Sequence, residues 1–320
     1  MAAIETTALT KRYGSTVAVD ELALEVAEGE IFGFLGPNGA GKSTTINLLM
    51  NFTHPTDGTG RVCGYDVVTE TRAVRERTGI LADGIDLYDR LSGRRHLELA
   101  IDWSDGDESV STLLDRVALD AADAKKPVGG YSKGMKQRVA LAMALAGDPD
   151  VLILDEPASG LDPIGIRLLR ELVREEAERG TTVFFSSHDL SQVEAVCDRI
   201  GILNDGSLVA VDSATGLRDA IGANGELKLR LAAPPRIAVE RIEGVEHAVY
   251  DAGQLTITCD DPTAKSHVIY HLIDAGHVIQ DIDVEQAALE DVFTAYTNGS
   301  SPVPEPTAQP SAADEMEVVL

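Results

Sequence analysis

The chain has 320 residues, of which 44% are hydrophobic, and 53 acidic against 27 basic residues give a formal net charge of −26. The length predicts about two domains, and the acidic excess argues against nucleic acid as a partner, because phosphate binding needs a basic surface. No run approaches the roughly 18 apolar residues of a membrane-spanning helix, and no secretion signal is visible, so we expect a cytoplasmic protein.

The first elements predicted along the chain are strands. Residues 1–35 alternate apolar and polar side chains in two or three short stretches, which is typical of antiparallel strands. The last part, Glu30–Leu35, predicts a buried parallel strand, and a helix is predicted to open at Thr44–Met50. Between them, residues 36–44 match the pattern GxxxxGK[ST] of a phosphate-binding loop, beside a helix N-terminus that favours anions.

This loop has the composition that a triphosphate site needs. Glycines let backbone N–H groups approach the phosphates, Lys42 supplies a mobile positive charge, and the Ser43 hydroxyl can bind magnesium. The sequence therefore predicts a nucleoside triphosphate site with Mg²⁺. The residues assigned to the nucleotide here are Gly36, Pro37, Asn38, Gly39, Ala40, Gly41, Lys42, Ser43 and Thr44.

The middle of the chain alternates helical and strand patterns. A turn-rich stretch is predicted at His54–Gly64, and residues 92–147 carry apolar residues at the three-to-four spacing of helices. Val151–Leu154 and Thr182–Ser186 predict short buried strands with a helix, Ile164–Arg179, between them. This βαβ rhythm implies a parallel sheet.

Two adjacent carboxylates end the strand at 151–154. Asp155 stands where a carboxylate can hold magnesium, whereas Glu156 points differently and can polarise an attacking water. Combined with the phosphate loop, this pair predicts hydrolysis of the triphosphate.

Further motifs resemble one family. Residues 131–138, Tyr-Ser-Lys-Gly-Met-Lys-Gln-Arg, resemble the signature sequence of the ATP-binding cassette (ABC) family. Ser159–Pro163 resembles the family's D-loop, and Ser187-His188-Asp189 resembles its switch histidine. Tyr13 occupies the place of the aromatic residue that stacks on adenine. The resemblance covers about residues 4–215. The alternative of a metabolic kinase with a phosphate loop would not account for the signature sequence or for His188.

The resemblance implies a fold and a set of site residues. The fold is an α/β ABC ATPase core of the P-loop NTPase type, residues 1–220, with an antiparallel β subdomain and a helical subdomain at about 92–147. The nucleotide is ATP, and a second ATP-binding subunit, either another copy or a paralogue, completes the site. Ser132, Gly134 and Asp162 are assigned to the nucleotide, Glu156 and His188 to catalysis, and Ser43 and Asp155 to the metal.

Two positions depart from the family pattern. Lys133 stands where many members have glycine, although Ser132 and Gly134 are kept. The Q-loop position, which carries Gln or Glu in the family, falls on Asp83, whose side chain is shorter. We assign Asp83 to the magnesium site by this resemblance, with a contact to the ion that can pass through a water molecule.

Two segments resemble exporter-type cassettes of the multidrug and polyketide-antibiotic export group: Leu87–Gly93 and Leu289–Phe293. In that group a separate integral membrane permease forms the path, so the chain is expected to lie on the inner face of the membrane. The second segment can equally be an amphipathic helix that packs on its own domain. The alternative function is a soluble ABC-type ATPase acting on the ribosome or DNA, which usually has two cassettes or long coiled coils.

The last third of the chain differs in composition. Residues 221–297 predict a small accessory α+β domain, and residues 298–320 predict a disordered acidic tail rich in proline. The diffuse acidic excess, with few aromatic residues, suggests a protein of salt-saturated cytoplasm, as in haloarchaea, because salt screens the self-repulsion.

Overall fold

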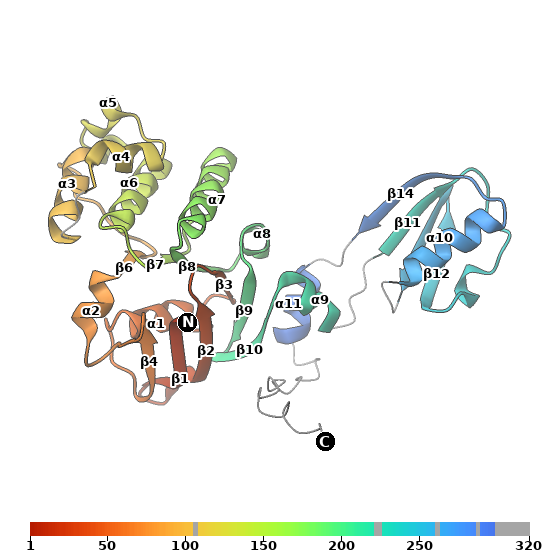
Figure 1. Ribbon diagram of the computed structural model, residues 1–320, viewed down its shortest axis with the longest axis horizontal. Helices are drawn as coiled ribbons and strands as arrows, with labels where there is room; N and C mark the ends of the chain where they lie inside the picture. Colours follow the sequence, from red (N-terminus) through yellow and green to blue (C-terminus); the bar gives the residue numbers. More distant parts are fainter. Residues whose placement is uncertain (105–107, 221–225, 260–262, 286–288, 298–320) are drawn as a thin grey trace, which may run out of the picture.

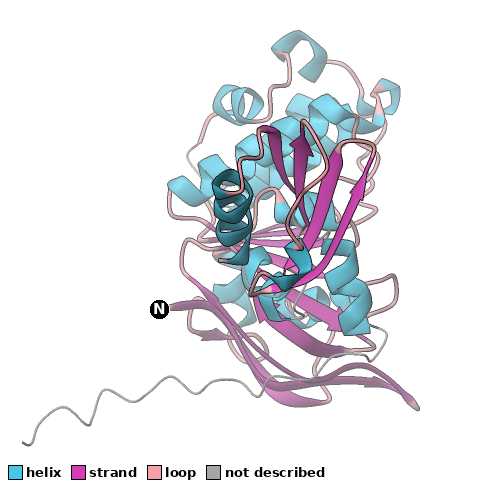
Figure 2. Cartoon of the chain, turned by 90° about the vertical axis from the view of Figure 1, so that its right-hand side faces the viewer, coloured by secondary structure: helices cyan, strands magenta, loops and turns pink. Residues whose placement is uncertain are grey.

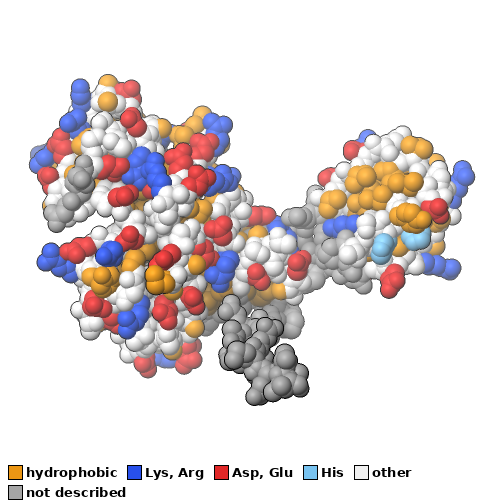
Figure 3. Space-filling view, viewed as in Figure 1, with side chains coloured by type: hydrophobic (Ala, Val, Ile, Leu, Met, Phe, Trp, Pro, Cys, Tyr) orange, Lys and Arg blue, Asp and Glu red, His pale blue; other side chains and the backbone are white. Residues whose placement is uncertain are grey.

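The computed structural model describes residues 1–104, 108–220, 226–259, 263–285 and 289–297. Figure 1 shows three β-sheets and a separate group of helices, α3 to α6, which stands above the strands. Acidic and basic side chains are interspersed over the face shown in Figure 3. No helix within the described ranges is long and apolar enough to cross a membrane.

An antiparallel sheet with strand order β2-β1-β4-β5 forms the first layer. It makes a curved layer at the base of the view in Figure 2. Its buried side chains pack against Phe32, Phe34 and Phe184 of the second sheet and against α1, which gives one apolar core between the two sheets. The strands are β1 (Ala2–Tyr13), β2 (Thr16–Ala27), β4 (Asp57–Val62) and β5 (Tyr65–Asp66).

The prediction of a turn-rich stretch at His54–Gly64 was wrong for residues 57–62, because β4 pairs there with β1, and holds for the turn at residues 63–64. Gly58 and the neighbouring Asp and Thr residues are typical of turns. The register shifts between Thr7 and Thr10, and a Cβ on Gly58, whose φ is +76°, would overlap the backbone of Ala8. Gly58 therefore marks a β-bulge inside a strand.

The second sheet has the order β10-β9-β3-β8-β7-β6, and all its pairs except β9–β10 are parallel. Every residue of its central strands is buried, as expected of a parallel sheet covered on both faces. The predicted βαβ rhythm is confirmed. The strands are β3 (Ile31–Leu35), β6 (Thr78–Leu81), β7 (Val151–Asp155), β8 (Thr182–Ser187), β9 (Arg199–Asn204) and β10 (Ser207–Asp212); the helices are α1 (Lys42–Leu49), α2 (Thr71–Glu76), α7 (Pro163–Glu178), α8 (Leu190–Glu194) and α9 (Ala214–Ala220).

The helical group lies between β6 and β7 in sequence and packs through its apolar side chains on the second sheet. The amphipathic spacing at 92–147 is explained by this packing, since α3 and α6 bury their apolar faces against each other. The elements are α3 (Gly93–Ser104), α4 (Val110–Arg116), α5 (Ala121–Ala124), the 3₁₀ turn Val128–Gly130 and α6 (Lys133–Leu145).

A third sheet, order β12-β13-β11-β14, follows residue 225 and has its own apolar core beneath α10. The final helix α11 leaves this sheet and packs on α8, α9 and β9, with Val292 and Tyr296 buried in the core of the second sheet (Figure 1). The accessory domain predicted at 221–297 includes both α11 and the third sheet. In the structure, however, α11 contacts elements of residues 1–220. The predicted tail at 298–320 lies outside the described residues. The elements are β11 (Glu226–Leu231), the 3₁₀ turn Val239–Arg241, β12 (Val245–Asp251), β13 (Gln254–Cys259), α10 (Ala264–Asp274), β14 (Ile279–Glu285) and α11 (Leu289–Thr297).

Candidate functional site

The loop at residues 36–41 joins β3 to α1 along a path that leaves no room for a side chain at Gly36 or Gly41. Gly41 has a φ of +111°, and a Cβ there would overlap the carbonyl oxygen of Ala18 in β2. A Cβ on Gly36 would lie 2.6 Å from the carbonyl oxygen of Leu203 in β9. The loop thus passes close to two strands at its glycines, and glycines also allow the close approach of backbone N–H groups to phosphate.

Lys42, Glu156 and His188 come from three separate elements and meet beside this loop. The Lys42 Nζ is buried, donates to the Gly36 carbonyl oxygen at 2.6 Å, and lies 3.5 Å from Glu156 Oε1. The other carboxylate oxygen, Oε2, lies 2.8 Å from Nδ1 of His188. The Glu156 carboxylate therefore bridges the lysine and the histidine.

The backbone of Glu156 is in the left-handed region, with a φ of +49°. For a residue with a Cβ this conformation costs about 1–2 kcal/mol. Its N–H donates to the Ser186 carbonyl oxygen at 3.2 Å, which holds the chain in this turn. The turn sends the Glu156 side chain in a different direction from that of Asp155.

Asp155 ends β7 as a buried carboxylate. The Ser186 hydroxyl of β8 donates to its Oδ1 at 2.5 Å, so one oxygen is oriented by the neighbouring strand. Ser43 stands exposed in the first turn of α1. Our sequence reasoning did not single out Ser186; the available signal was a pair of serines at the end of an otherwise apolar strand.

Ser132 and Asp162 lie at helix N-termini. The Ser132 hydroxyl accepts from the Met135 N–H at 3.2 Å and caps α6, which starts beside Gly134. Asp162 caps α7 by accepting from the Gly165 N–H at 2.7 Å. Within the described ranges, no hydrogen bond or ion pair joins Ser132 or Asp162 to residues 36–44. The structure therefore gives both residues a capping function and does not bring them to the loop of the same chain.

Asp83 and Tyr13 are both exposed and stand at the edges of this region. Asp83 follows β6 and lines a cavity of about 240 Å³ together with Glu156, but within the described ranges it accepts no hydrogen bond from Ser43. Tyr13 ends β1, with the Lys11 ammonium 4.9 Å from its ring centroid. The β2 strand that follows carries Ala18, which touches the phosphate loop.

Asp189 follows the predicted switch histidine and caps α8 by accepting from the Ser191 N–H at 2.9 Å. Burial, the largest single influence, raises the pKa of the Asp189 carboxyl, but hydrogen bonds from Ser191 and Gln192 together hold it below its ordinary value. The carboxylate therefore stays ionised at neutral pH, and the backbone after His188 is fixed at the start of a helix.

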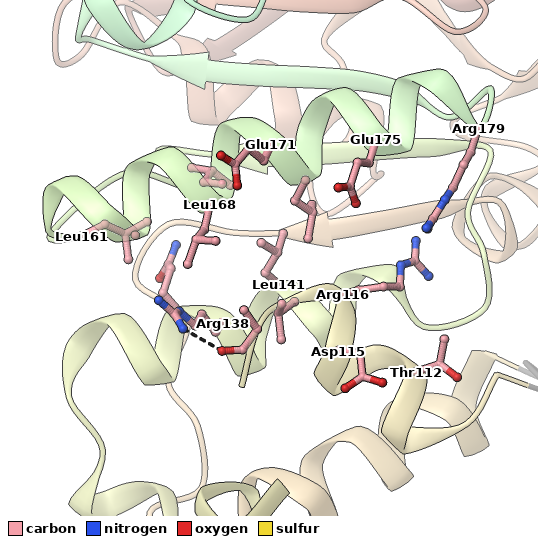
Figure 4. A pocket seen from close by; sticks show the side chains of 16 residues that line it. Thr112, Asp115, Arg116, Arg138, Leu141, Leu161, Leu168, Glu171, Glu175 and Arg179 are labelled. Atoms are coloured by element: carbon pink, nitrogen blue, oxygen red, sulfur yellow. Dashed lines mark hydrogen bonds between the residues drawn. The ribbon is translucent and has the colours of Figure 1, made fainter. Parts of the chain in front are cut away.

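A cavity of about 450 Å³ lies away from this site, between α7 and the helices α4 and α6. Figure 4 shows Leu141 and Leu168 facing each other across it and Arg116 at one end. Arg116 Nη2 is 2.5 Å from Glu176 Oε2, and both side chains are buried. None of the residues predicted to bind nucleotide lines this cavity.

Comparison with known proteins identifies the family. The family model described as "ABC transporter" matches residues 19–159. The chain is 34% identical over 307 residues to the daunorubicin/doxorubicin resistance ATP-binding protein DrrA of Streptomyces peucetius, with 92% of each chain covered. It is 42% identical over 209 residues to the bacitracin transport ATP-binding protein BcrA of Bacillus licheniformis, covering 64% of this chain and 68% of that protein.

Solved structures agree with this result. A dimeric ATP-binding cassette in a post-hydrolysis state, bound to ADP and Pi, is 26% identical with a TM-score of 0.58, covering 66% of this chain and 98% of that one. The loop, the two carboxylates and the histidine thus stand in a fold whose relatives hydrolyse ATP. The chain belongs to the ABC transporter ATP-binding subunits and is an ATPase.

Proposed function

We propose that the chain is the ATP-hydrolysing subunit of a membrane exporter and acts with a separate integral membrane permease. The observation that carries the catalytic part is the cluster of Lys42, Glu156 and His188 at the phosphate loop. The exporter part is supported by the similarity to an antibiotic-resistance protein, which extends over 92% of the chain and not only over the ATPase part.

In this proposal the residues divide the work of phosphoryl transfer. Lys42 and the loop amides bind the phosphates, and Lys42 exchanges its contact with Glu156 for the negative phosphate oxygens. Glu156 then orients or deprotonates the attacking water, while His188 contacts the γ-phosphate. Positioning and charge stabilisation of this kind account for most catalysis of phosphoryl transfer.

The donors near the loop fit a magnesium ion. Asp155 offers a buried carboxylate that Ser186 orients, and Ser43 offers a hydroxyl, which together are the hard oxygen ligands that Mg²⁺ prefers. When bound there, the ion neutralises charge on the phosphates. Asp83 is the proposed third metal residue, acting through water because of its short side chain.

The proposal includes a second ATP-binding subunit. Ser132 and Gly134 stand at the start of α6, where exposed N–H groups and the helix dipole favour a phosphate. In the part of the chain that the structure describes, no hydrogen bond or ion pair joins Ser132 to the phosphate loop, which supports a site completed head-to-tail with a second copy or a paralogue. The assembly would lie on the cytoplasmic face of the membrane through the permease.

We also propose a division of the chain into an ATPase domain, residues 1–220, and an accessory domain. The third sheet, residues 226–285, has its own core, whereas the contacts of α11 support assigning that helix to the ATPase domain. The accessory sheet is then tethered to the ATPase domain at both of its ends.

A pulldown of the full chain from solubilised membranes tests the transport assignment. We expect a polytopic membrane protein to be recovered with the chain. Recovery of ribosomal proteins or DNA instead would favour a soluble ABC-type ATPase and would overturn the exporter proposal while leaving ATP hydrolysis intact.

Tyr88 is predicted to contact the permease. Its side chain is 70% exposed, and its ring stacks beside His96 at the start of the helical subdomain. Tyr88→Glu should abolish transport in reconstituted vesicles and leave ATP hydrolysis by the isolated subunit unchanged. Tyr270→Glu, at an aromatic residue 65% exposed on α10, is the control and should preserve both activities. Normal transport by Tyr88→Glu would exclude this surface as the docking site.

Leu91 lies in the same exporter-like segment as Tyr88. It is half-buried, and its carbonyl oxygen accepts from the Val128 N–H at 2.9 Å. Leu91→Glu should therefore lower the melting temperature as well as transport, because it places a charge at a half-buried position. Thermal unfolding of Leu91→Glu beside Tyr88→Glu separates the two effects. A parental melting temperature for Leu91→Glu would assign Leu91 to the docking surface alone.

The acidic excess predicts a dependence on salt. Raising KCl from 0.1 M to about 1 M shortens the screening length from about 10 Å to about 3 Å and weakens repulsion among the 53 carboxylates and between two like-charged subunits. ATPase activity and melting temperature should both rise over this range. A low-salt optimum for both would overturn the halophilic proposal without affecting the ATPase assignment.

A further inference from the structure

Two positions that depart from the ABC family pattern face the same cavity. Asp83, at the Q-loop position, and Lys133, in the signature sequence, both line the cavity of about 240 Å³ that also borders Glu156. The cavity walls carry the carboxylates of Asp83, Asp86 and Glu156. The two departures therefore place opposite charges in the lining of one small space.

The Lys133 side chain lies on the D-loop of its own chain. A Cβ placed on Gly160 would overlap the end of the Lys133 side chain, including Nζ and Cε. Gly160 has a φ of +71°, so the loop turns at this point under the lysine. A glycine at position 133 would leave this turn uncovered on the side of the cavity.

One further contact from α6 holds the same loop. The Gln137 Nε2 donates to the Pro157 carbonyl oxygen at 3.0 Å. Helix α6 is thus attached at Pro157 to the segment 157–161, which directly follows Glu156. A small displacement of this segment would displace the Glu156 carboxylate.

The charge on Lys133 is available for this interaction. Lys136, one turn further along, pairs with Asp89 at 3.0 Å, whereas Lys133 makes no ion pair with any residue within the described ranges. The ammonium lies over Gly160, and Lys133 and Lys136 line the cavity together with the three carboxylates. At a surface site with an effective dielectric constant of about 20, such charges attract over several ångströms.

We propose that Lys133 is a positioning residue for ATP hydrolysis. The end of its side chain, ammonium included, lies over Gly160, and the negative charge of Asp83 at the same cavity favours the ammonium there, which keeps the loop after Glu156 in place. The inference rests on the proposed role of Glu156 as the residue that activates water. It also gives a function to the two residues that differ from the family pattern.

The test compares three substitutions at position 133 in the full chain. Lys133→Met keeps the stem and removes the charge, Lys133→Gly removes both, and Lys133→Arg keeps the charge. We expect kcat to fall on the order of tenfold in Lys133→Met and further in Lys133→Gly, because misplacing a catalytic group by a fraction of an ångström has effects of this size. Lys133→Arg should restore most of the rate, and KM for ATP should stay at the parental value, since Lys42 and Tyr13 are untouched.

A double-mutant cycle with Asp83→Asn identifies the partner. If the two charges contribute to hydrolysis only by their mutual attraction, the double variant Lys133→Met/Asp83→Asn should have a kcat no lower than that of the less active single variant. Lys125→Met is the matched control, because Lys125 is also an exposed lysine of the helical subdomain but does not line the cavity. Its kcat should equal that of the parent.

Four results would overturn the inference. A parental kcat in Lys133→Met would show that the charge of Lys133 does not contribute to hydrolysis. Equal rates for the Met and Arg variants would show the same. Multiplicative losses in the cycle would exclude Asp83 as the partner. A fall in melting temperature that accounts for the loss of rate would make the role purely structural. Failure of the proposed function is recognised separately, by full activity of Glu156→Gln with Lys133 intact.

Discussion

Glu156→Gln is expected to bind ATP as the parent chain does and to hydrolyse it at least about a hundredfold more slowly, the range for loss of a general base. The amide has the shape of the carboxylate and can still accept from His188 Nδ1, which donates at 2.8 Å in the parent. It cannot take a proton from water. Removing the charge also releases Lys42, now 3.5 Å from Oε1, to the phosphates, so ATP affinity should not fall.

Phosphate release in single-turnover and steady-state assays measures the hydrolysis, and equilibrium binding of a fluorescent ATP analogue measures the affinity. Glu178→Gln is the matched control: it removes a carboxylate from the exposed end of α7 and should leave both quantities unchanged. Hydrolysis by Glu156→Gln at the parental rate would show that another group activates the water. The proposed catalytic role of the cluster of Lys42, Glu156 and His188 would then be wrong.

Ser132→Arg, introduced into the Glu156→Gln chain, is expected to abolish ATP-dependent dimerisation. Without that change the Glu156→Gln chain should form a dimer with ATP, because in the proposed assembly the phosphate loop of one subunit and the start of α6 in the other hold the same nucleotide. An arginine side chain at position 132 fills the space that the γ-phosphate would occupy. Light scattering with and without ATP measures the dimer.

The control for this experiment comes from a second capping serine. Ser109 caps α4 by accepting from the Thr112 N–H at 3.1 Å, as Ser132 caps α6. Each substitution removes one cap, which costs about 1 kcal/mol of stability. Ser109→Arg should therefore lose the same stability as Ser132→Arg but keep the dimer. A dimer in Ser132→Arg, or one that forms equally without ATP, would reject the head-to-tail site.

The two variants report on different parts of the proposal. Glu156→Gln tests chemistry within one chain, and Ser132→Arg tests the contribution of the second chain. Binding of ATP to monomeric Ser132→Arg should be nearly normal, since Lys42 and the glycines of the loop are intact. Loss of ATP binding in that variant would show that Ser132 acts within its own chain.

Much of the fold and the motif residues could be predicted from the sequence because they depend on local pattern. Residues 36–44 contain the glycines and the lysine of the loop within nine consecutive positions, and the apolar run before them predicts the strand that the structure has as β3. The spacing in 92–147 predicts helices because an apolar stripe recurs with the helical period. Asp155 and Glu156 were identified by their place at the end of a fully apolar strand.

Other features were decided by tertiary structure, because they depend on contacts between residues distant in sequence. The strand β4 was not predicted, because Gly58 is typical of turns. Its bulge depends on the pairing of β4 with β1, which the local sequence does not show. The helix α11 follows the third sheet in sequence, but it buries Val292 and Tyr296 on the ATPase core, where an apolar surface is available. Its amphipathic pattern alone was compatible with either location.

The site itself illustrates the same division. The sequence by itself determined which residue types were present and on which strand, loop or helix each stands. Only the folded chain decided that Glu156 bridges Lys42 and His188, that Ser186 orients Asp155, and that Lys133 lies on Gly160. The physical reason is that a parallel sheet brings the carboxyl ends of β3, β7 and β8 to one edge, whereas the rotamers and distances there depend on packing among all three.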